Sequence, residues 1–162
     1  MILVDTNILV YAVNSDAPQH AACRALVEAV RTGDSRCALV PQVLLEFYAI
    51  VTDRRRVAKP LDAAQAREAI EALHSIFPVP DAGSEALDRL PDAIAEKTVT
   101  GGEVFDAWLV AQMRVLGMDR ICTYNAKDFA GYKGIRAVRP GELTGGEQKV
   151  EKAAKGKNAH GK

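Results

Sequence analysis

Acidic side chains in separate parts of the chain are the residues best suited to chemistry. Asp5 follows the apolar run 1–4 and precedes a second apolar run over 8–13, the pattern of a short buried strand that stops at a carboxylate and turns into a helix. In open parallel sheets, ligands bind in the crevice beyond the carboxyl ends of the strands. Asp5 therefore stands where a catalytic or metal-binding group is expected, although Asp5, Thr6 and Asn7 could instead cap the helix.

Two further acids fall on predicted helix faces that are otherwise apolar. In the helix expected over 41–52, Glu46 shares a stripe with Val43, Phe47 and Ile50. In the helix expected over 104–116, Asp106 shares a face with Leu109, Val110 and Met113. Glu46 could reach solvent or pair with a nearby arginine, and Asp106 could complement the helix start. Two unpaired buried carboxylates would be doubly costly, which favours a shared ligand.

A fourth candidate region follows the strand expected over 120–123. Thr123, Asn125 and Asp128 repeat the opening arrangement of an apolar strand, a hydroxyl residue, an asparagine and a carboxylate within reach. An Asx-type turn that closes a surface loop is the alternative explanation. Both explanations stay open from the residues alone.

Alternating strand and helix patterns must position these acids. Strands are expected over 1–4, 38–40, 120–123 and 135–138, with only a short edge segment over 77–80. Helices are expected over 19–30, 41–52, 61–77, 84–97 and 104–116, and Pro91 is expected to kink or split the fourth of these. This alternation predicts an α/β fold with a mainly parallel sheet covered by helices. Residues 1–140 are the expected domain, and 141–162 the expected disordered Lys/Gly-rich tail.

Acids gathered at one sheet edge would repel one another without a cation. Oxygen-only ligands suit Mg²⁺ or Mn²⁺, which bind a few carboxylates and leave positions open for water and phosphate. Such ions activate a water and stabilise the leaving oxygen of a phosphodiester, so metal-assisted hydrolysis is the chemistry inferred. Arg54, Arg55 and Arg56 close the helix over 41–52, where they either complement the helix end or grip phosphate.

The composition sets limits on the class of protein. The 162 residues carry 21 basic and 21 acidic side chains, so any contact with nucleic acid must come from a local patch. Cys23, Cys37 and Cys122 are expected to be buried reduced thiols, and the histidines lack the spacing of a zinc site. No stretch approaches the roughly 20 apolar residues that span a bilayer, so no membrane contact and a cytoplasmic location are expected.

Four motifs in order give the chain a family resemblance. They are Val4-Asp5-Thr6-Asn7, Pro41-Gln42-Val43-Leu44-Leu45-Glu46-Phe47, Gly101-Gly102-Glu103-Val104-Phe105-Asp106-Ala107 and Thr123-Tyr124-Asn125-Ala126-Lys127-Asp128-Phe129. Together with His20-Ala21, they resemble the motifs of PIN-domain ribonucleases, most closely the VapC toxins of bacterial type II toxin-antitoxin pairs. The resemblance covers about residues 1–140.

The resemblance implies both a fold and an activity. The fold is a three-layer PIN-like domain with a central, mainly parallel four- or five-stranded sheet flanked by helices. The activity is Mg²⁺- or Mn²⁺-dependent endonucleolytic cleavage of RNA, inhibited by a cognate antitoxin, in a protein that forms a homodimer.

The motifs also imply roles for individual residues. Asp5, Glu46 and Asp106 form the core catalytic triad and the metal ligands, with Thr6, Asn7 and Thr123 orienting the carboxylates. Many relatives have Asp where this chain has Asn125, so either Asn125 is a neutral ligand or Asp128 supplies the fourth catalytic charge.

Two other functions are compatible with parts of the pattern. A non-catalytic PIN-like RNA-binding scaffold would fit if the fourth acid is missing. A Mg²⁺-dependent phosphatase of the haloacid-dehalogenase type needs a second Asp two residues after the first, where this chain has Asn7. A phospho-receiver needs an acceptor Asp at the end of its third strand, where this chain has Arg54 to Arg56. Retention of the triad favours catalysis.

Overall fold

A four-stranded parallel sheet forms the centre of the computed structural model, which describes residues 1–145. The strands are β1 (Ile2–Val4), β2 (Cys37–Ala38), β3 (Arg120–Cys122) and β4 (Arg136–Val138), in the order β2-β1-β3-β4. β1 is central and buried along its whole length, as a strand covered by helices on both faces must be. The predicted parallel sheet is confirmed, with four strands.

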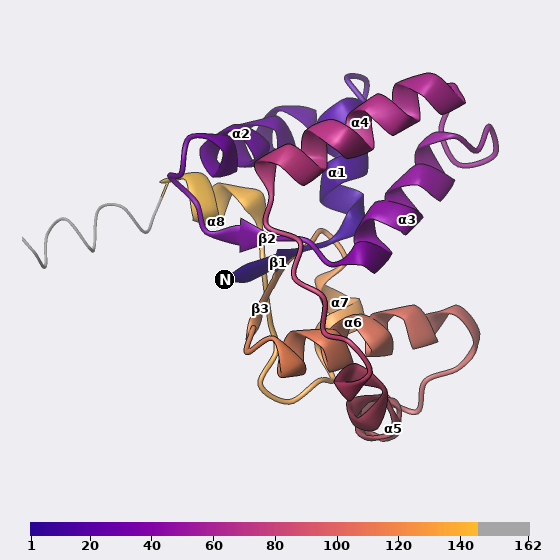
Figure 1. The fold of residues 1–162 in the computed structure, drawn as a ribbon, viewed down its shortest axis with the longest axis vertical. Coiled ribbons are helices and arrows are strands. Elements are labelled where there is room, and N and C mark those ends of the chain that lie inside the picture. The colour runs from indigo at the N-terminus through magenta and orange to yellow at the C-terminus, as the bar shows by residue number, and fades with distance from the viewer. Residues whose placement is uncertain (146–162) are drawn as a thin grey trace, which may run out of the picture.

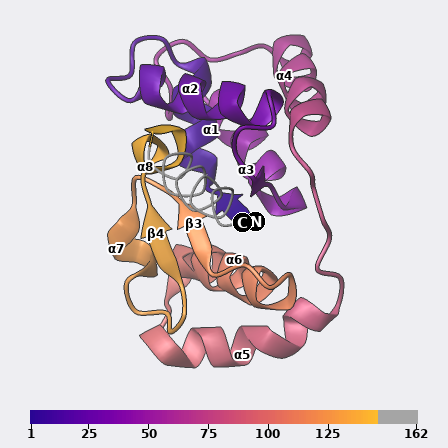
Figure 2. The ribbon, with the colours of Figure 1, turned by 90° about the vertical axis from the view of Figure 1, so that its left-hand side faces the viewer.

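Helices cover both faces of this sheet and make three layers (Figures 1 and 2). On one side lie α1 (Thr6–Val13), α2 (His20–Arg31), α3 (Pro41–Val51), α4 (Ala63–Ile76) and α8 (Pro140–Gly145). On the other side lie α5 (Glu85–Lys97) and α6 (Val104–Val115), and the short elements η1 (Gly101–Glu103) and α7 (Ala126–Phe129) complete the described chain. No helix of residues 1–145 is long and apolar enough to cross a membrane.

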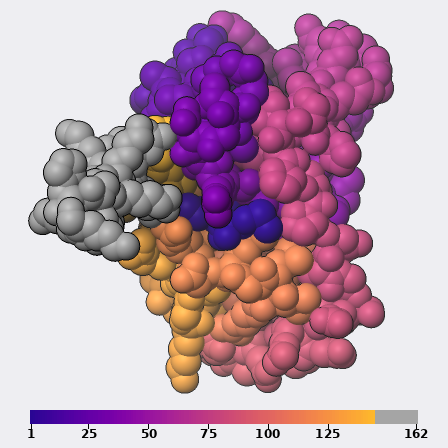
Figure 3. Space-filling view, turned by 60° about the vertical axis from the view of Figure 1, so that its left-hand side comes forward, coloured from indigo at the N-terminus to yellow at the C-terminus, as the bar shows by residue number. Residues whose placement is uncertain are grey.

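The two ends of the parallel strands lie on opposite sides of the molecule. Figure 3 shows the start of the chain reaching the surface between the two helical layers, where Met1 is 55% exposed. Because all four strands run in the same direction, their carboxyl ends share the opposite side. Asp5 and Thr123, which follow β1 and β3, are therefore brought to one edge.

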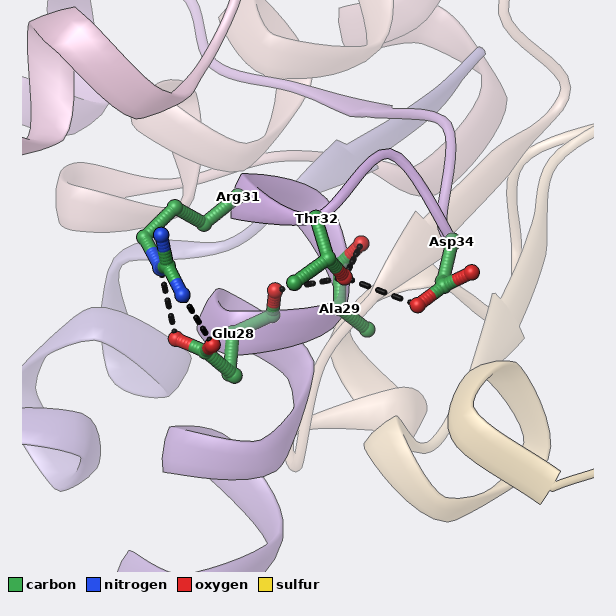
Figure 4. Close-up of polar contacts among 5 residues, drawn as sticks. All are labelled: Glu28, Ala29, Arg31, Thr32 and Asp34. Carbon is green, nitrogen blue, oxygen red and sulfur yellow. Dashed lines mark hydrogen bonds and ion pairs between the residues drawn. The ribbon is translucent and has the colours of Figure 1, made fainter.

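Hydrogen bonds at the end of α2 turn the chain toward β2 (Figure 4). The hydroxyl of Thr32 donates to the carbonyl oxygens of Glu28 at 3.1 Å and Ala29 at 3.3 Å, and to the Asp34 carboxylate at 2.8 Å. Arg31 pairs with the Glu28 side chain one turn earlier. The Thr32 amide also donates to the Glu28 carbonyl and the Asp34 amide to the Ala29 carbonyl, so the last carbonyls of the helix have partners where the backbone leaves it.

Three sequence predictions about the elements need correction. Residues 77–80 form no strand; the Leu39 amide donates to the Pro78 carbonyl at 3.0 Å, and the prolines there have no N–H to extend a ladder. β2 ends at Ala38 rather than at residue 40. α5 continues through Pro91 as one helix, so the alternative that Pro91 splits it is wrong.

The folded domain extends beyond residue 140. Pro140 begins α8, and Leu143 is buried where that helix packs against α2 (Figure 2). Pro140 and Leu143 are both buried, and the polar composition of the segment concealed this apolar contribution. The rest of the predicted tail, 146–162, lies outside the described residues.

Candidate active site

The candidate site lies where the order in which strands are added to the sheet reverses. The chain leaves β1 for β2 on one side, and β3 later pairs with β1 on the other side. Such a switch point opens a crevice at the carboxyl ends of the two strands. The Asp5 amide donates to the Cys122 carbonyl at 3.0 Å and the Thr123 amide donates to the Val138 carbonyl at 3.0 Å, so the backbone holds both residues at this edge.

Asp5 is buried and held by two neutral side chains. Its Oδ2 atom accepts hydrogen bonds from Thr123 Oγ1 at 2.6 Å and from Asn7 Nδ2 at 2.6 Å. Asn7 Oδ1 in turn accepts from the Tyr124 amide at 3.2 Å, which fixes the Asn7 side chain between β1 and β3. Asp5 occupies the N-cap position of α1 without a side-chain capping bond, while the backbone amides of Thr6 and Asn7 lower the pKa of its carboxyl group.

Both oxygens of Glu46 are also held. Thr6 Oγ1 donates to Oε2 at 2.9 Å, and Gln42 Nε2 donates to Oε1 at 2.6 Å. Thr6 begins α1, while Gln42 precedes Glu46 by one turn of α3. Among residues 1–145 no arginine forms an ion pair with Glu46, so the alternative of a simple salt bridge is not what the structure shows.

Asp106 carries the clearest electrostatic sign of acid crowding. Burial, followed by the negative charge of Asp128 and of Asp5, raises the pKa of Asp106 to about 6, and Glu46 adds to the rise. Burial likewise raises the pKa of Asp5, while the hydrogen bond from Thr123 opposes that rise. Raised pKa values mean that the folded chain does not compensate all of this negative charge.

The three acids of the predicted triad line one pocket of about 340 Å³. Asn125 and Arg56 also line the pocket, together with Thr6, Asn7 and an apolar side formed by Val10, Tyr11 and Ile50. Asp5 enters from the end of β1, Glu46 from α3 and Asp106 from the start of α6. The pocket therefore combines clustered carboxylates with one cation and one apolar side.

The remaining predicted residues lie apart from the pocket lining. Asp128 lies on α7 and acts on Asp106 through its charge, whereas Asn125 lines the pocket itself. Arg55 forms an ion pair with Asp53 at 2.9 Å, and neither Arg54 nor Arg55 lines the pocket. Of the two candidates for the fourth position, the geometry favours Asn125, and of the three arginines it favours Arg56.

The chemistry of the pocket fits a hard divalent cation. Carboxylate, hydroxyl and amide oxygens line it, and no histidine or cysteine does. No three His, Cys, Asp or Glu side chains in the described part of the chain lie where they could together hold one ion. Mg²⁺ keeps several waters and uses one or two carboxylates, so acids spread around a pocket suit it, with the more distant ones acting through water.

Three residues outside the pocket lining interact with the residues of the site, and sequence alone assigns no role to them. Gln42 and Gln112 link α3 to α6, and Lys97 lowers the pKa of Asp106 while its Nζ donates to the Asp128 carbonyl at 2.6 Å. Gln42 precedes Glu46 by four residues in the predicted helix, and this spacing brings side chains together. The contact between Gln42 and Glu46 could therefore have been predicted from the sequence. Lys97 reaches the site through the packing of α5 on α6, which no local pattern encodes.

Comparison with known proteins identifies the family of this chain. The family model described as PIN domain matches residues 2–134. The chain is 30% identical over 149 residues to Ribonuclease VapC24 of Mycobacterium tuberculosis (strain ATCC 25618 / H37Rv), an alignment covering 86% of this chain and 97% of that protein.

Two solved structures share the fold. One is VapBC2 from Rickettsia felis bound to a DNA fragment from their promoter, with a TM-score of 0.62 and 18% identity over 86% of this chain and 98% of that chain. The other is a toxin-antitoxin complex from Klebsiella pneumoniae, with a TM-score of 0.59 and 21% identity over the same shares of the two chains. At these identities the likeness establishes the architecture of the domain.

Proposed function

Because the chain belongs to the PIN-domain family, and a VapC ribonuclease matches it over most of both chains, we propose that it is an endoribonuclease acting as the toxin of a toxin-antitoxin pair. Ribonucleases of this family generally depend on a divalent metal ion. The observation that carries the proposal is the convergence of Asp5, Glu46 and Asp106 on one pocket. A binding scaffold has no need for three carboxylates that repel one another.

The side chains of the pocket have different proposed roles. Asp5 and Asp106 are the residues that would hold Mg²⁺ or Mn²⁺, and Glu46 would hold the ion or a water bound to it. When bound, such an ion would activate a water and stabilise the charge that develops on the phosphate. Thr123 and Asn7 fix the direction of the Asp5 carboxylate through their 2.6 Å hydrogen bonds. Arg56 is the cation of the pocket lining and is placed to attract the RNA backbone.

The partners follow from the same family membership. We expect RNA as substrate, a cognate antitoxin protein as inhibitor, and a homodimer as the assembled state. We propose a cytoplasmic location, and we propose that the five lysines of residues 146–162 help to retain RNA.

A cleavage assay with matched variants tests the proposal. Purified protein freed of any antitoxin is incubated with a pool of structured cellular RNAs in Mg²⁺, in Mn²⁺ or in EDTA. Metal-dependent cuts are expected for the native chain and are expected to vanish in Asp5→Asn with the fold intact. Asp92→Asn makes the same chemical change on an exposed position of α5, away from the pocket lining, and should cut normally.

The assay also separates the catalytic proposal from the scaffold alternative. Folded native protein that binds RNA without cutting it under either metal would favour the scaffold. An Asp5→Asn variant that unfolds would instead show that Asp5 has a structural role, because relief of acid repulsion should leave the fold at least as stable.

A further inference from the structure

Gln112 is the buried polar side chain that the acidic pocket does not explain. The buried polar side chains of residues 1–145 are Asp5, Thr6, Gln112 and Thr123. The other three belong to the pocket or hold a residue that lines it. Gln112 is 4% exposed on α6 and does not line the pocket. An uncharged amide so deeply buried needs hydrogen-bond partners, and the partners it has show what it does.

A chain of hydrogen bonds runs from Gln112 to Glu46. Gln112 Nε2 donates to Gln42 Oε1 at 2.9 Å. Gln42 Nε2 then donates to Glu46 Oε1 at 2.6 Å and to the Phe105 carbonyl at 3.1 Å. The amide group of Gln42 thereby uses both of its hydrogens and accepts one bond on its oxygen.

The bond from Gln112 helps to determine which way the Gln42 amide faces. If the amide of Gln42 rotated by half a turn, its oxygen would face the Glu46 carboxylate and the Phe105 carbonyl, and acceptors would repel acceptors. Its NH₂ group would at the same time face the NH₂ group of Gln112. The donor of Gln112 therefore disfavours the reversed orientation at both ends of the amide.

The same amide ties two acids of the pocket to one another. Phe105 precedes Asp106, so Gln42 connects Glu46 on α3 to the turn of α6 that carries Asp106. Figure 1 shows α3 beginning near α6 and then running away from it. Gln42 lies in the first turn of α3, where a side chain can still reach α6.

We propose that Gln42 and Gln112 are positioning residues that hold Glu46 toward the pocket and set its place relative to Asp106. The proposal rests on the proposed metal-dependent nuclease function, but its effect on ion binding is measurable without any RNA. Groups that orient metal ligands typically change metal affinity or activity by about 10- to 100-fold when they are removed.

The test compares Gln112→Met with Gln112→Glu. Methionine keeps the length and volume of the side chain but donates no hydrogen bond, so the Gln42 amide loses the partner of its oxygen and is held only by Glu46 and the Phe105 carbonyl. Glutamate presents an oxygen to Gln42 and favours the reversed amide. We expect Mn²⁺ affinity, measured by calorimetric titration, to fall about tenfold in Gln112→Met and further in Gln112→Glu. The rate constant kcat for RNA cleavage should fall with it, while KM changes little.

A double variant shows whether Gln112 acts through Gln42. Gln42→Met should weaken Mn²⁺ binding by itself, and adding Gln112→Met to it should cause no further loss, because the group between Gln112 and Glu46 is already gone. Gln65→Met is the stability control. It removes the capping box of α4 and should lower the unfolding temperature without changing Mn²⁺ affinity.

Each outcome supports or overturns the proposal. Unchanged Mn²⁺ affinity and kcat in Gln112→Met, with only a lower unfolding temperature, would show that Gln112 merely packs. Additive losses in the double variant would show that Gln112 does not act through Gln42. Native protein that binds no Mn²⁺ would remove both the metal assignment and this role. Native protein that binds Mn²⁺ but cuts no RNA would overturn the nuclease function, and the titrations would still decide the role of the two glutamines.

Discussion

The pKa of Asp106 gives a stability prediction at the residue scale. Because burial and the neighbouring acids raise this pKa to about 6 from an ordinary 3.8, the folded chain binds the proton more tightly than the unfolded chain. The ionised carboxylate therefore destabilises the fold, and this cost grows as the pH rises from about 4 through 6. Asp106→Asn should raise the free energy of unfolding by roughly 1–3 kcal/mol near pH 7.5 in EDTA.

Urea denaturation of both proteins at two pH values measures this effect. The gain should shrink near pH 4.5, where the folded carboxyl is already mostly protonated. Asp92→Asn on the exposed face of α5 should show no such pH-dependent gain. A loss of stability in Asp106→Asn near neutral pH would mean that the carboxylate makes a stabilising contact in the folded chain.

A second residue-scale prediction concerns RNA binding by the consecutive arginines Arg54, Arg55 and Arg56. Arg56 lines the acidic pocket and Arg54 does not, although both side chains are exposed. Arg56→Ala should weaken RNA binding and reduce the slope of log affinity against log salt by about one contact. Arg54→Ala, its matched control, should change the slope less. Binding titrations in EDTA at several salt concentrations measure both, and equal losses would indicate a diffuse basic surface rather than a contact at the pocket.

The site could be predicted from sequence where a residue conflicts with its local pattern. Asp5 ends an apolar strand, and Glu46 and Asp106 interrupt apolar helix faces, so the sequence alone marks each of them. Asp128 fits the same pattern and acts on Asp106 through its charge, but it does not line the pocket, whereas Asn125, the N-cap residue of α7, does. Whether a side chain points into a pocket depends on backbone turns that the spacing of residues does not determine.

At the scale of elements, the end of α5 is an unusual helix terminus. Thr98 has φ 51° and ψ 58°, a left-handed conformation that glycine adopts freely and a β-branched residue disfavours. Thr98→Gly should therefore stabilise the fold by about 0.5–1 kcal/mol, measured by thermal or urea unfolding. Lys97 precedes this position and donates to the Asp128 carbonyl, so α5 ends beside the site.

Thr52 at the end of α3 is the matched control for this substitution. It has right-handed angles, φ −95° and ψ −9°, and its hydroxyl donates to the Tyr48 carbonyl at 2.8 Å. Thr52→Gly relieves no strain, loses this hydrogen bond and increases the freedom of the unfolded chain, so it should destabilise the protein. Thr98→Gly could also destabilise the protein as much as Thr52→Gly does. The contacts of the Thr98 side chain would then stabilise the fold by more than the left-handed backbone conformation costs.

The elements themselves were predictable where one signal dominated. Apolar runs bounded by turn residues gave the strands, and periodic apolar positions gave the long helices. Predictions failed where distant segments meet: residues 77–80 form no strand although the Pro78 carbonyl accepts from the Leu39 amide, and Leu143 is buried in a helix that packs against α2. Such contacts join residues far apart in sequence, and a local pattern contains no information about them.

At the scale of the whole molecule, folding and ion binding should be linked. The pocket acids come from residues 5, 46 and 106, which only the complete sheet and its helices bring together. An ion bound by these acids therefore binds the folded chain in preference to the unfolded one and also relieves the repulsion that raises the pKa values of Asp5 and Asp106. The unfolding temperature should rise with Mn²⁺ concentration.

The size of this rise follows from the linkage relation. A free ion concentration 100 times the dissociation constant adds about 2.7 kcal/mol, which corresponds to roughly 5–10 °C for a domain of this size. Differential scanning calorimetry over a series of Mn²⁺ concentrations measures it. Asp106→Asn should begin from a higher unfolding temperature in EDTA and gain much less from Mn²⁺, because the substitution removes both the repulsion and a ligand. An equal rise in both proteins would place the ion elsewhere on the molecule, and the acid cluster would then need another explanation.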